Sequence, residues 1–261
     1  MIAVILCGGY GSRLRPFTNN VPKALLEFGS IYLIDYIIYQ IDKSAIIDDI
    51  IVVTNGRYFE NFSDWKDKAE KNRHINIEII SDGTMTEETQ LGAVAEIAFL
   101  LEHKNINDDV LIIAGDNYFE FNLYLMYNLF ITKNSIVIAV CNLRDNGLLS
   151  RKYGVVEIDQ NNKINYFDEK PKNPKTSLAS TACYMIKQND LIELQRYLRN
   201  ASDKDTLGEY IKWLVRSGNV VHGFVFNEAW YDIGTIDMYI EFNIFIENKL
   251  KKIPYLSLIC N

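Results

Sequence analysis

The sequence predicts an α/β fold in which helices cover both faces of a mostly parallel sheet. Through the first half of the chain, short apolar runs of strand length alternate with longer amphipathic stretches, which is typical of such sheets. The second half adds strands joined by a hairpin turn, so the sheet is expected to be mixed. The 261 residues and the hydrophobic content of 48% suffice to bury a large core.

Four strands and three helices are expected in the first half. The strands are short, mainly apolar runs at Ile2–Cys7, Ile50–Thr54, Ile75–Ile80 and Val110–Ala114, and Ile2–Cys7 is expected to be fully buried. Three helices are expected. Ile31–Ile41 has apolar residues at helical spacing with Ser30 as its cap, and Tyr58–Lys71 has aromatic residues at such spacing. The third helix begins at the polar start signal of Thr86 and runs through Leu101.

The second half is expected to hold a hairpin, further strands and three helices. The turn Asp159–Asn162 joins two of the strands, because Asp and Asn favour tight turns. The strands are expected at Ser135–Cys141, Tyr153–Ile158, Ile164–Glu169, Thr181–Ile186 and Val220–Phe226. The helices are expected at Asp190–Leu198, at Leu207–Arg216 and from Ile236 onward.

Composition excludes several classes of function. The 27 Lys and Arg against 34 Asp and Glu give a net charge of −7, which disfavours a nucleic-acid polymer as partner. No apolar run approaches the roughly 18–20 residues of a membrane span, and no basic region precedes the first apolar run. No cysteine pair has CxxC spacing, and buried hydrophobic positions are expected for most of Cys7, Cys141, Cys183 and Cys260. A soluble, reduced, cytoplasmic protein is therefore expected.

The glycine-rich segment directly after the first strand is the most informative stretch. Glycines at this place let a backbone approach phosphate oxygens, and nearby cations can bind those oxygens. The residues concerned are Leu6, Gly8, Gly9, Gly11, Ser12, Arg13 and Lys23. The third glycine of the dinucleotide fingerprint is missing, and no Gly-Lys-Ser/Thr follows, so both common phosphate-loop patterns fail. The alternative is a plain surface loop with solvated cations.

The whole chain resembles the sugar-1-phosphate nucleotidyltransferases, and most closely the glucose-1-phosphate thymidylyltransferases. The family's glycine signature is matched by residues 8–18 and by the Pro-Lys-x-Leu of residues 22–25. Four further motifs follow in the family's order: Gly-Asp-Asn at 115–117, Tyr-Gly-Val-Val at 153–156, Glu-Lys-Pro at 169–171 and Trp-x-Asp-x-Gly-Thr at 230–235. Each motif alone is weak, but their joint order is specific.

The resemblance implies a Rossmann-like three-layer α/β/α fold with a sugar-binding β insertion. It also implies one domain over residues 1–261, with a nucleotide-binding half at 1–130, a sugar-phosphate-binding half at 131–240 and a C-terminal helix and tail at 241–261. The tail from Lys249 is apolar, so it is expected to pack on the domain or on a partner. Relatives form dimers or tetramers, so a homo-oligomer is a further expectation.

The activity implied by the resemblance is transfer of a nucleotidyl group from dTTP or UTP to a sugar-1-phosphate, with glucose-1-phosphate favoured. Arg13 and Lys23 would hold the triphosphate, and Lys170 the sugar phosphate. Mg²⁺ would be held by Asp116 and Asp232. Sugar contacts would come from Asn117, Tyr153, Gly154, Glu169 and Thr181, and base contacts from Gly83, Thr84, Leu91 and Gly92.

Structural alternatives exist for these residues. Asp116 could be a strand-end turn residue, Asp232 a helix cap, and Lys170 a solvated surface lysine. Glu169 could form a surface salt bridge, and Gly154 a strand bulge. The base loop at 82–92 and the segment Thr181–Tyr184 depart from the thymidylyltransferase pattern. Cytidylyl or guanylyl transfer, a small acceptor such as phosphocholine, and a non-catalytic nucleotide or sugar sensor therefore stay open.

Overall fold

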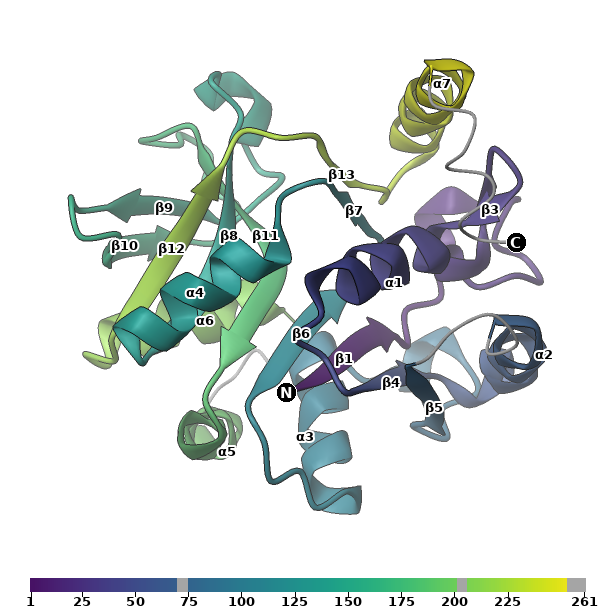
Figure 1. Ribbon diagram of the computed structural model, residues 1–261, viewed down its shortest axis with the longest axis horizontal. Coiled ribbons are helices and arrows are strands. Elements are labelled where there is room, and N and C mark those ends of the chain that lie inside the picture. Colours follow the sequence, from purple (N-terminus) through teal and green to yellow (C-terminus); the bar gives the residue numbers. More distant parts are fainter. Residues whose placement is uncertain (70–74, 201–205, 253–261) are drawn as a thin grey trace. The chain divides into compact units, whose positions relative to one another are not determined.

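The computed structural model describes residues 1–69, 75–200 and 206–252. The chain divides into two compact units (Figure 1). The N-terminal unit comprises Ile2–Gln90, Ala114–Glu120 and Ala229–Asn261, and the central unit comprises Met1, Leu91–Ile113 and Phe121–Glu228. Residues 253–261, which make up most of the apolar tail, and Cys260 with them, lie outside the described residues.

The N-terminal unit is built on three parallel strands. β1 (Ile2–Cys7) pairs with β4 (Asp49–Thr54), and β4 pairs with β5 (Asn76–Ser81). All three match predicted strands closely. β1 and β4 are almost fully buried, whereas β5, at the edge of the sheet, buries Ile77 and leaves its other residues partly or fully exposed. The helices of this unit are α1 (Leu33–Ser44), α2 (Phe59–Ala69) and α7 (Ile236–Lys252).

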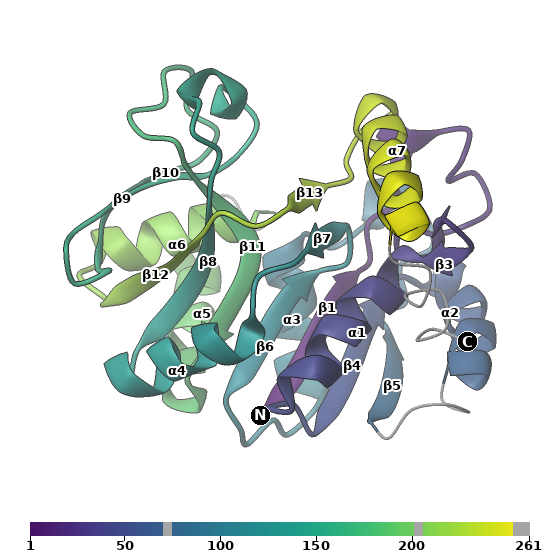
Figure 2. The ribbon, with the colours of Figure 1, turned by 45° about the horizontal axis from the view of Figure 1, so that its top comes forward.

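Two short pairs of antiparallel strands complete this unit. β2 (Glu27–Phe28) pairs with β3 (Ile31–Tyr32), and β7 (Asn117–Phe119) pairs with β13 (Trp230–Asp232), both antiparallel. Both views show α7, in yellow, beside β3 (Figure 2). A core of aromatic and aliphatic side chains joins these elements, because Phe242 of α7 packs on the rings of Phe28, Tyr36 and Tyr118.

The central unit contains a mixed sheet. Its strands are β6 (Val110–Ala114), β8 (Ile136–Asn142), β9 (Val155–Ile158), β10 (Ile164–Asp168), β11 (Leu178–Ile186) and β12 (Val221–Phe226). β11 is antiparallel to β6, β8 and β9, whereas β12 runs parallel to β8. Figure 1 shows α4 (Leu123–Lys133) in front of this sheet and α6 (Leu207–Arg216) behind it. α3 (Ala93–His103) and α5 (Leu191–Asn200) complete the unit.

The predicted α/β fold with a mixed sheet and flanking helices is confirmed. The hairpin at residues 159–162 is confirmed too: Asp159 Oδ1 accepts bonds from the amides of Asn161 and Lys163, at 2.8 and 3.0 Å, and Asn162 adopts φ 67°. Cys7, Cys141 and Cys183 are buried, as predicted. In the described part of the chain, no helix combines the length and the apolar character that crossing a bilayer requires.

Two predicted helices were partly wrong. The stretch from Thr86 forms only a 3-10 turn at Glu87–Thr89, and α3 starts at Ala93, because the chain is extended at Gln90 and Gly92 caps the helix. The stretch from Ile31 begins as β3, and its helix starts at Leu33. Ser30 is no cap, since it adopts φ 69° in the β2–β3 turn.

Some elements were not predicted at all. α4 has exposed apolar residues at Tyr124, Leu125 and Ile131 as well as buried ones, so its sequence lacks a clear helical period. β7 and β13 are three residues long each, and their pairing joins segments more than a hundred residues apart. Local patterns do not reveal contacts of that separation. The division into nucleotide and sugar halves stays a prediction.

Candidate active site

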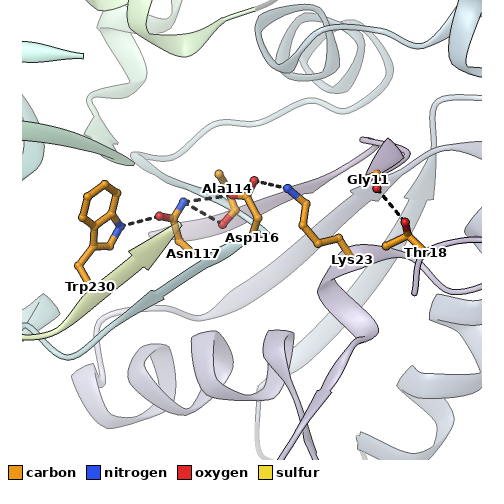
Figure 3. A network of polar contacts seen from close by, with 7 residues as sticks. All are labelled: Gly11, Thr18, Lys23, Ala114, Asp116, Asn117 and Trp230. Atoms are coloured by element: carbon orange, nitrogen blue, oxygen red, sulfur yellow. Dashed lines mark hydrogen bonds and ion pairs between the residues drawn. The ribbon is translucent and has the colours of Figure 1, made fainter. Parts of the chain in front are cut away.

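The glycine-rich loop leaves β1 through a turn that only glycine fits well. Gly11 adopts φ 62°, and its carbonyl accepts bonds from the Leu14 amide at 2.8 Å and the Thr18 hydroxyl at 2.7 Å (Figure 3). A Cβ on Gly11 would lie 3.0 Å from Thr18 Cγ2. Thr18 is itself buried. The loop is therefore a fixed structure, which disfavours the plain surface loop.

Two residues that the sequence did not single out hold this loop. Asn55, fully buried at the end of β4, donates to the carbonyl of Gly8 at 2.9 Å. Its Oδ1 accepts from the amide of Tyr58, and the Tyr58 hydroxyl donates to the carbonyl of Thr18, both at 3.0 Å. The signal was an Asn-Gly pair directly after a predicted strand, at the sheet edge where α/β proteins bind ligands.

An ion pair joins the loop region to the end of β6. Lys23 Nζ lies 2.5 Å from Asp116 Oδ2, and both side chains are partly buried, at 17% and 25% exposure. Gly115 allows this approach: a Cβ there would overlap the Cys7 thiol and lie 2.9 Å from the Leu6 carbonyl. The Gly115 amide donates to that carbonyl at 2.9 Å. Two predicted catalytic residues, 93 positions apart, thus meet.

The second predicted metal ligand is brought to the same place by β13. Asp232 pairs with Asn117, and the amide of Ile233 donates to the carbonyl of Asp116 at 2.9 Å. Asp232 is therefore a strand residue, so the helix-cap alternative is wrong. A Cβ on Gly234 would lie 3.5 Å from Arg13 Nη2 and 3.6 Å from Asp232 Oδ1, so the side chains of Arg13 and Asp232 both lie next to this glycine.

This donor set fits a magnesium ion that also binds substrate phosphates. In the described part of the chain, no group of three or more His, Cys, Asp and Glu residues could hold a metal. Mg²⁺ needs no such cage, because it is usually bound by one or two carboxylates together with substrate phosphates and water. Asp116 and Asp232 supply two hard carboxylates, and Lys23 forms an ion pair with Asp116.

A second group of predicted residues lies in the central unit around Glu169. A Cβ on Gly154 would lie 2.9 Å from Glu169 Oε2, and a Cβ on Gly208 in the first turn of α6 would overlap the same carboxylate. Lys170 Nζ lies 3.6 Å from Glu169 Oε1. Burial raises the pKa of Glu169 above its ordinary value of 4.5, and the neighbouring Lys170 partly offsets this effect. The side chain of Glu169 is thus mostly buried, at 13% exposure, and it forms an ion pair with Lys170, whose side chain is 51% exposed.

The backbone around Glu169 is strained where the predicted residues sit. Lys170 adopts φ 48°, and its amide donates to the carbonyl of Tyr153 at 3.2 Å. Thr181 is buried, and its hydroxyl donates to the carbonyl of Ala139 at 3.1 Å. The next residue, Ala182, adopts φ 51° within a register shift between β11 and β8. Gly208 was not predicted, since nothing in its local sequence connects it to Glu169.

The four residues expected to contact the base fall into both units. Gly83 adopts φ 78°, and the carbonyl of Thr84 accepts from the Gly56 amide at 2.7 Å. Asp82 Oδ1 accepts from the amide and the hydroxyl of Thr84, both at 2.8 Å. Leu91 and Gly92 belong to the central unit and lead into α3. The base contacts stay a prediction.

Comparison with known proteins gives one consistent result. The family model described as nucleotidyl transferase matches residues 2–249. Bifunctional protein GlmU of Methanococcus aeolicus is 32% identical over 90% of this chain and 51% of its own length. Glucose-1-phosphate adenylyltransferase of Fervidobacterium nodosum is 29% identical over 94% of this chain and 60% of its own length. The chain thus spans between half and two thirds of these relatives.

Solved structures show the same fold. A Bacillus anthracis protein with the provisional name glucose-1-phosphate thymidylyltransferase, in complex with sucrose, aligns with a TM-score of 0.78. The alignment covers 94% of this chain and 95% of that one, at 22% identity. At that identity the likeness concerns the fold.

Proposed function

Because the chain belongs to the nucleotidyl transferase family, we propose that it transfers a nucleotidyl group from a nucleoside triphosphate to a sugar-1-phosphate. Glucose-1-phosphate is the proposed acceptor, supported by the name of the Fervidobacterium relative. dTTP or UTP is the proposed donor, and ATP is the rival because that relative is named an adenylyltransferase. The observation that carries the proposal is the Lys23–Asp116 pair beside the fixed glycine loop.

The reaction needs charge and position more than covalent catalysis. A phosphate oxygen of the sugar-1-phosphate attacks the α-phosphorus, the bond from that phosphorus to the bridging oxygen breaks, and pyrophosphate leaves with the electron pair. Arg13 and Lys23 supply positive charge for the triphosphate, and the glycine loop supplies backbone amides. Lys170 would orient the sugar phosphate, and Glu169 would accept hydrogen bonds from sugar hydroxyls. Bound Mg²⁺ would neutralise phosphate charge.

Release of pyrophosphate tests the proposal. Five triphosphates (dTTP, UTP, ATP, CTP and GTP) crossed with glucose-1-phosphate, other sugar-1-phosphates and phosphocholine decide base and acceptor together. Pyrophosphate is expected only when triphosphate, acceptor and Mg²⁺ are all present. If no pair of substrates in the panel gives turnover but ligands still bind tightly, the result would contradict the proposal and favour a non-catalytic nucleotide or sugar sensor.

A matched pair of variants tests the role of Asp116. Asp116→Asn should abolish turnover and leave the fold intact, because the amide cannot replace a charged ligand. Asp109→Asn is the control, since Asp109 pairs with Lys187 at 3.2 Å with similar exposures of 25% and 19%. It should keep full activity. Normal turnover in Asp116→Asn would contradict the assigned role.

A further inference from the structure

A hydrogen bond across the β7–β13 pair fixes the side chain of Asn117. Trp230 Nε1 donates to Asn117 Oδ1 at 2.7 Å (Figure 3). Asn117 is only 3% exposed, so its amide is held inside the protein. Asn117 directly follows Asp116, which is paired with Lys23. The side chain of Asn117 therefore links Trp230 to Asp116, a proposed metal ligand.

The chemistry of the indole decides which way the amide points. An indole N–H can donate but not accept, so the atom that faces Trp230 must be the amide oxygen. The NH₂ group then faces the other way, and it lies 3.4 Å from both Asp116 Oδ1 and the carbonyl of Ala114. A reversed amide would place its oxygen against the carboxylate, acceptor against acceptor. Trp230 thereby keeps a donor at Asp116.

The carboxylate of Asp116 is consequently held from two sides. Lys23 approaches Oδ2, and the Asn117 amide faces Oδ1. Ligating carboxylates are usually oriented by such hydrogen bonds, and their loss weakens metal binding. Lys23 is expected to turn to the phosphates when substrate binds, which leaves Asn117 as the neighbour that stays. Asp116 Oδ1 then keeps the Asn117 amide as its neighbour, and Trp230 of β13 holds that amide.

We propose that Trp230 is a positioning residue, which acts through the Asn117 amide to orient the Asp116 carboxylate for a divalent cation. The inference rests on the proposed function for the identity of the cation site. It gives Asn117 a task other than the sugar contact expected from its motif. Both ends of its buried amide are engaged within the N-terminal unit.

Manganese binding to the full chain tests the inference without turnover. Mn²⁺ is titrated alone, and the free ion is followed by its electron paramagnetic resonance signal. Trp230→Phe keeps an aromatic ring at this position but removes the N–H donor, so it should weaken Mn²⁺ binding about 10-fold. Trp65→Phe is the control, because the indole N–H of Trp65 also donates to a side-chain oxygen, Asp35 Oδ1 at 3.3 Å, and not to Asn117. It should bind Mn²⁺ like the wild type.

A double-mutant cycle separates positioning from general damage. In an Asn117→Ala background, Trp230→Phe should change Mn²⁺ affinity less than about 2-fold, since the amide it orients is gone. If Trp230→Phe does not fold, Asn117→Ala alone makes the same prediction of weaker binding. Unchanged affinity in either folded variant, an undiminished effect of Trp230→Phe without Asn117, or a wild type that binds no Mn²⁺ would overturn the inference.

The Mg²⁺ dependence of pyrophosphate release gives a second readout. Trp230→Phe should raise the Mg²⁺ concentration for half-maximal rate and leave the rate at saturating Mg²⁺ within about 3-fold, because the ligands themselves remain. A protein that shows the Mn²⁺ effect but no turnover on any substrate pair would refute the proposed function and keep the inference. Turnover with a Mg²⁺ dependence that Trp230→Phe does not change would refute the inference and keep the proposed function.

Discussion

Replacing Gly154 with alanine should lower both the free energy of unfolding and the kcat/KM for the sugar phosphate, through two separate contacts of the added Cβ. The added Cβ would lie 2.6 Å from Phe167 Cζ, 0.8 Å inside the 3.4 Å at which ordinary contact begins. It would also lie 2.9 Å from Glu169 Oε2, so the carboxylate must give way by about 0.5 Å. Phe167 is buried in β10 and cannot move freely. Overpacking of this kind costs about 1–3 kcal/mol of unfolding free energy.

Two measurements report the two consequences. Urea unfolding should show the loss of 1–3 kcal/mol. Because a misplacement of about 1 Å can cost roughly 100-fold, a shift of half that size should lower kcat/KM for the sugar phosphate about 10-fold. The KM for the triphosphate should stay unchanged, since the glycine-rich loop belongs to the N-terminal unit.

A second substitution decides whether the clash is the cause. Phe167→Leu removes the ring atoms that the new Cβ meets. In that background Gly154→Ala should cost less than about 1 kcal/mol, while the loss of sugar-phosphate kcat/KM should persist through Glu169. The reasoning is refuted if Gly154→Ala costs the same free energy in both backgrounds, or if the folded variant uses the sugar phosphate normally.

Three further predictions follow from strain and titration. Ala182→Gly should stabilise the protein by about 0.5 kcal/mol, because relief of the left-handed backbone strain exceeds the entropy that glycine adds to the unfolded chain. Ala179→Gly in the same strand should destabilise the protein. Denaturant unfolding of both variants measures the two effects. The kcat/KM for the sugar phosphate should fall at acid pH with an apparent pKa above 4.5, since Glu169 must be ionised to accept hydrogen bonds from the sugar hydroxyls and burial raises its pKa. This acid-side fall should vanish in Glu169→Gln. An identical pH profile in that variant would contradict the prediction. Burial lowers the pKa of His222 below 6.5, so the folded state binds fewer protons than the unfolded one, and the stabilisation is present above pH 6.5 and lost as the pH falls. The fall of the melting temperature below pH 6.5 should be smaller in His222→Asn, and equal slopes would count against it.

The site illustrates which residues a sequence can reveal. The phosphate loop, Lys23, Asp116 and Asp232 stand in motifs whose order along the chain is specific, and the structure places Lys23 against Asp116. Asn55 and Gly208 have no such motif. Asn55 matters because its amide reaches Gly8, 47 positions away, and Gly208 because α6 brings it against Glu169. Their roles arise from contacts distant in sequence, so no local pattern encodes them.

The elements show the same division. Strands such as β1 and β4 were predictable, because a buried parallel strand must be a continuous apolar run. The break before α3 was not, since Gly92 and an extended Gln90 interrupt an otherwise helical pattern. The pairing of β7 with β13 was equally hidden, although it sets Asp232 beside Asn117.

The fold class could be predicted from local periodicity, and the candidate site residues from the order of their motifs. How the side chains of that site are oriented depends on contacts that form only in the folded chain. Trp230 and Asn117 lie 113 positions apart, and the direction of one buried amide depends on the single N–H that faces it. Orientation of this kind is a property of packed neighbours, and packing exists only once the chain has folded.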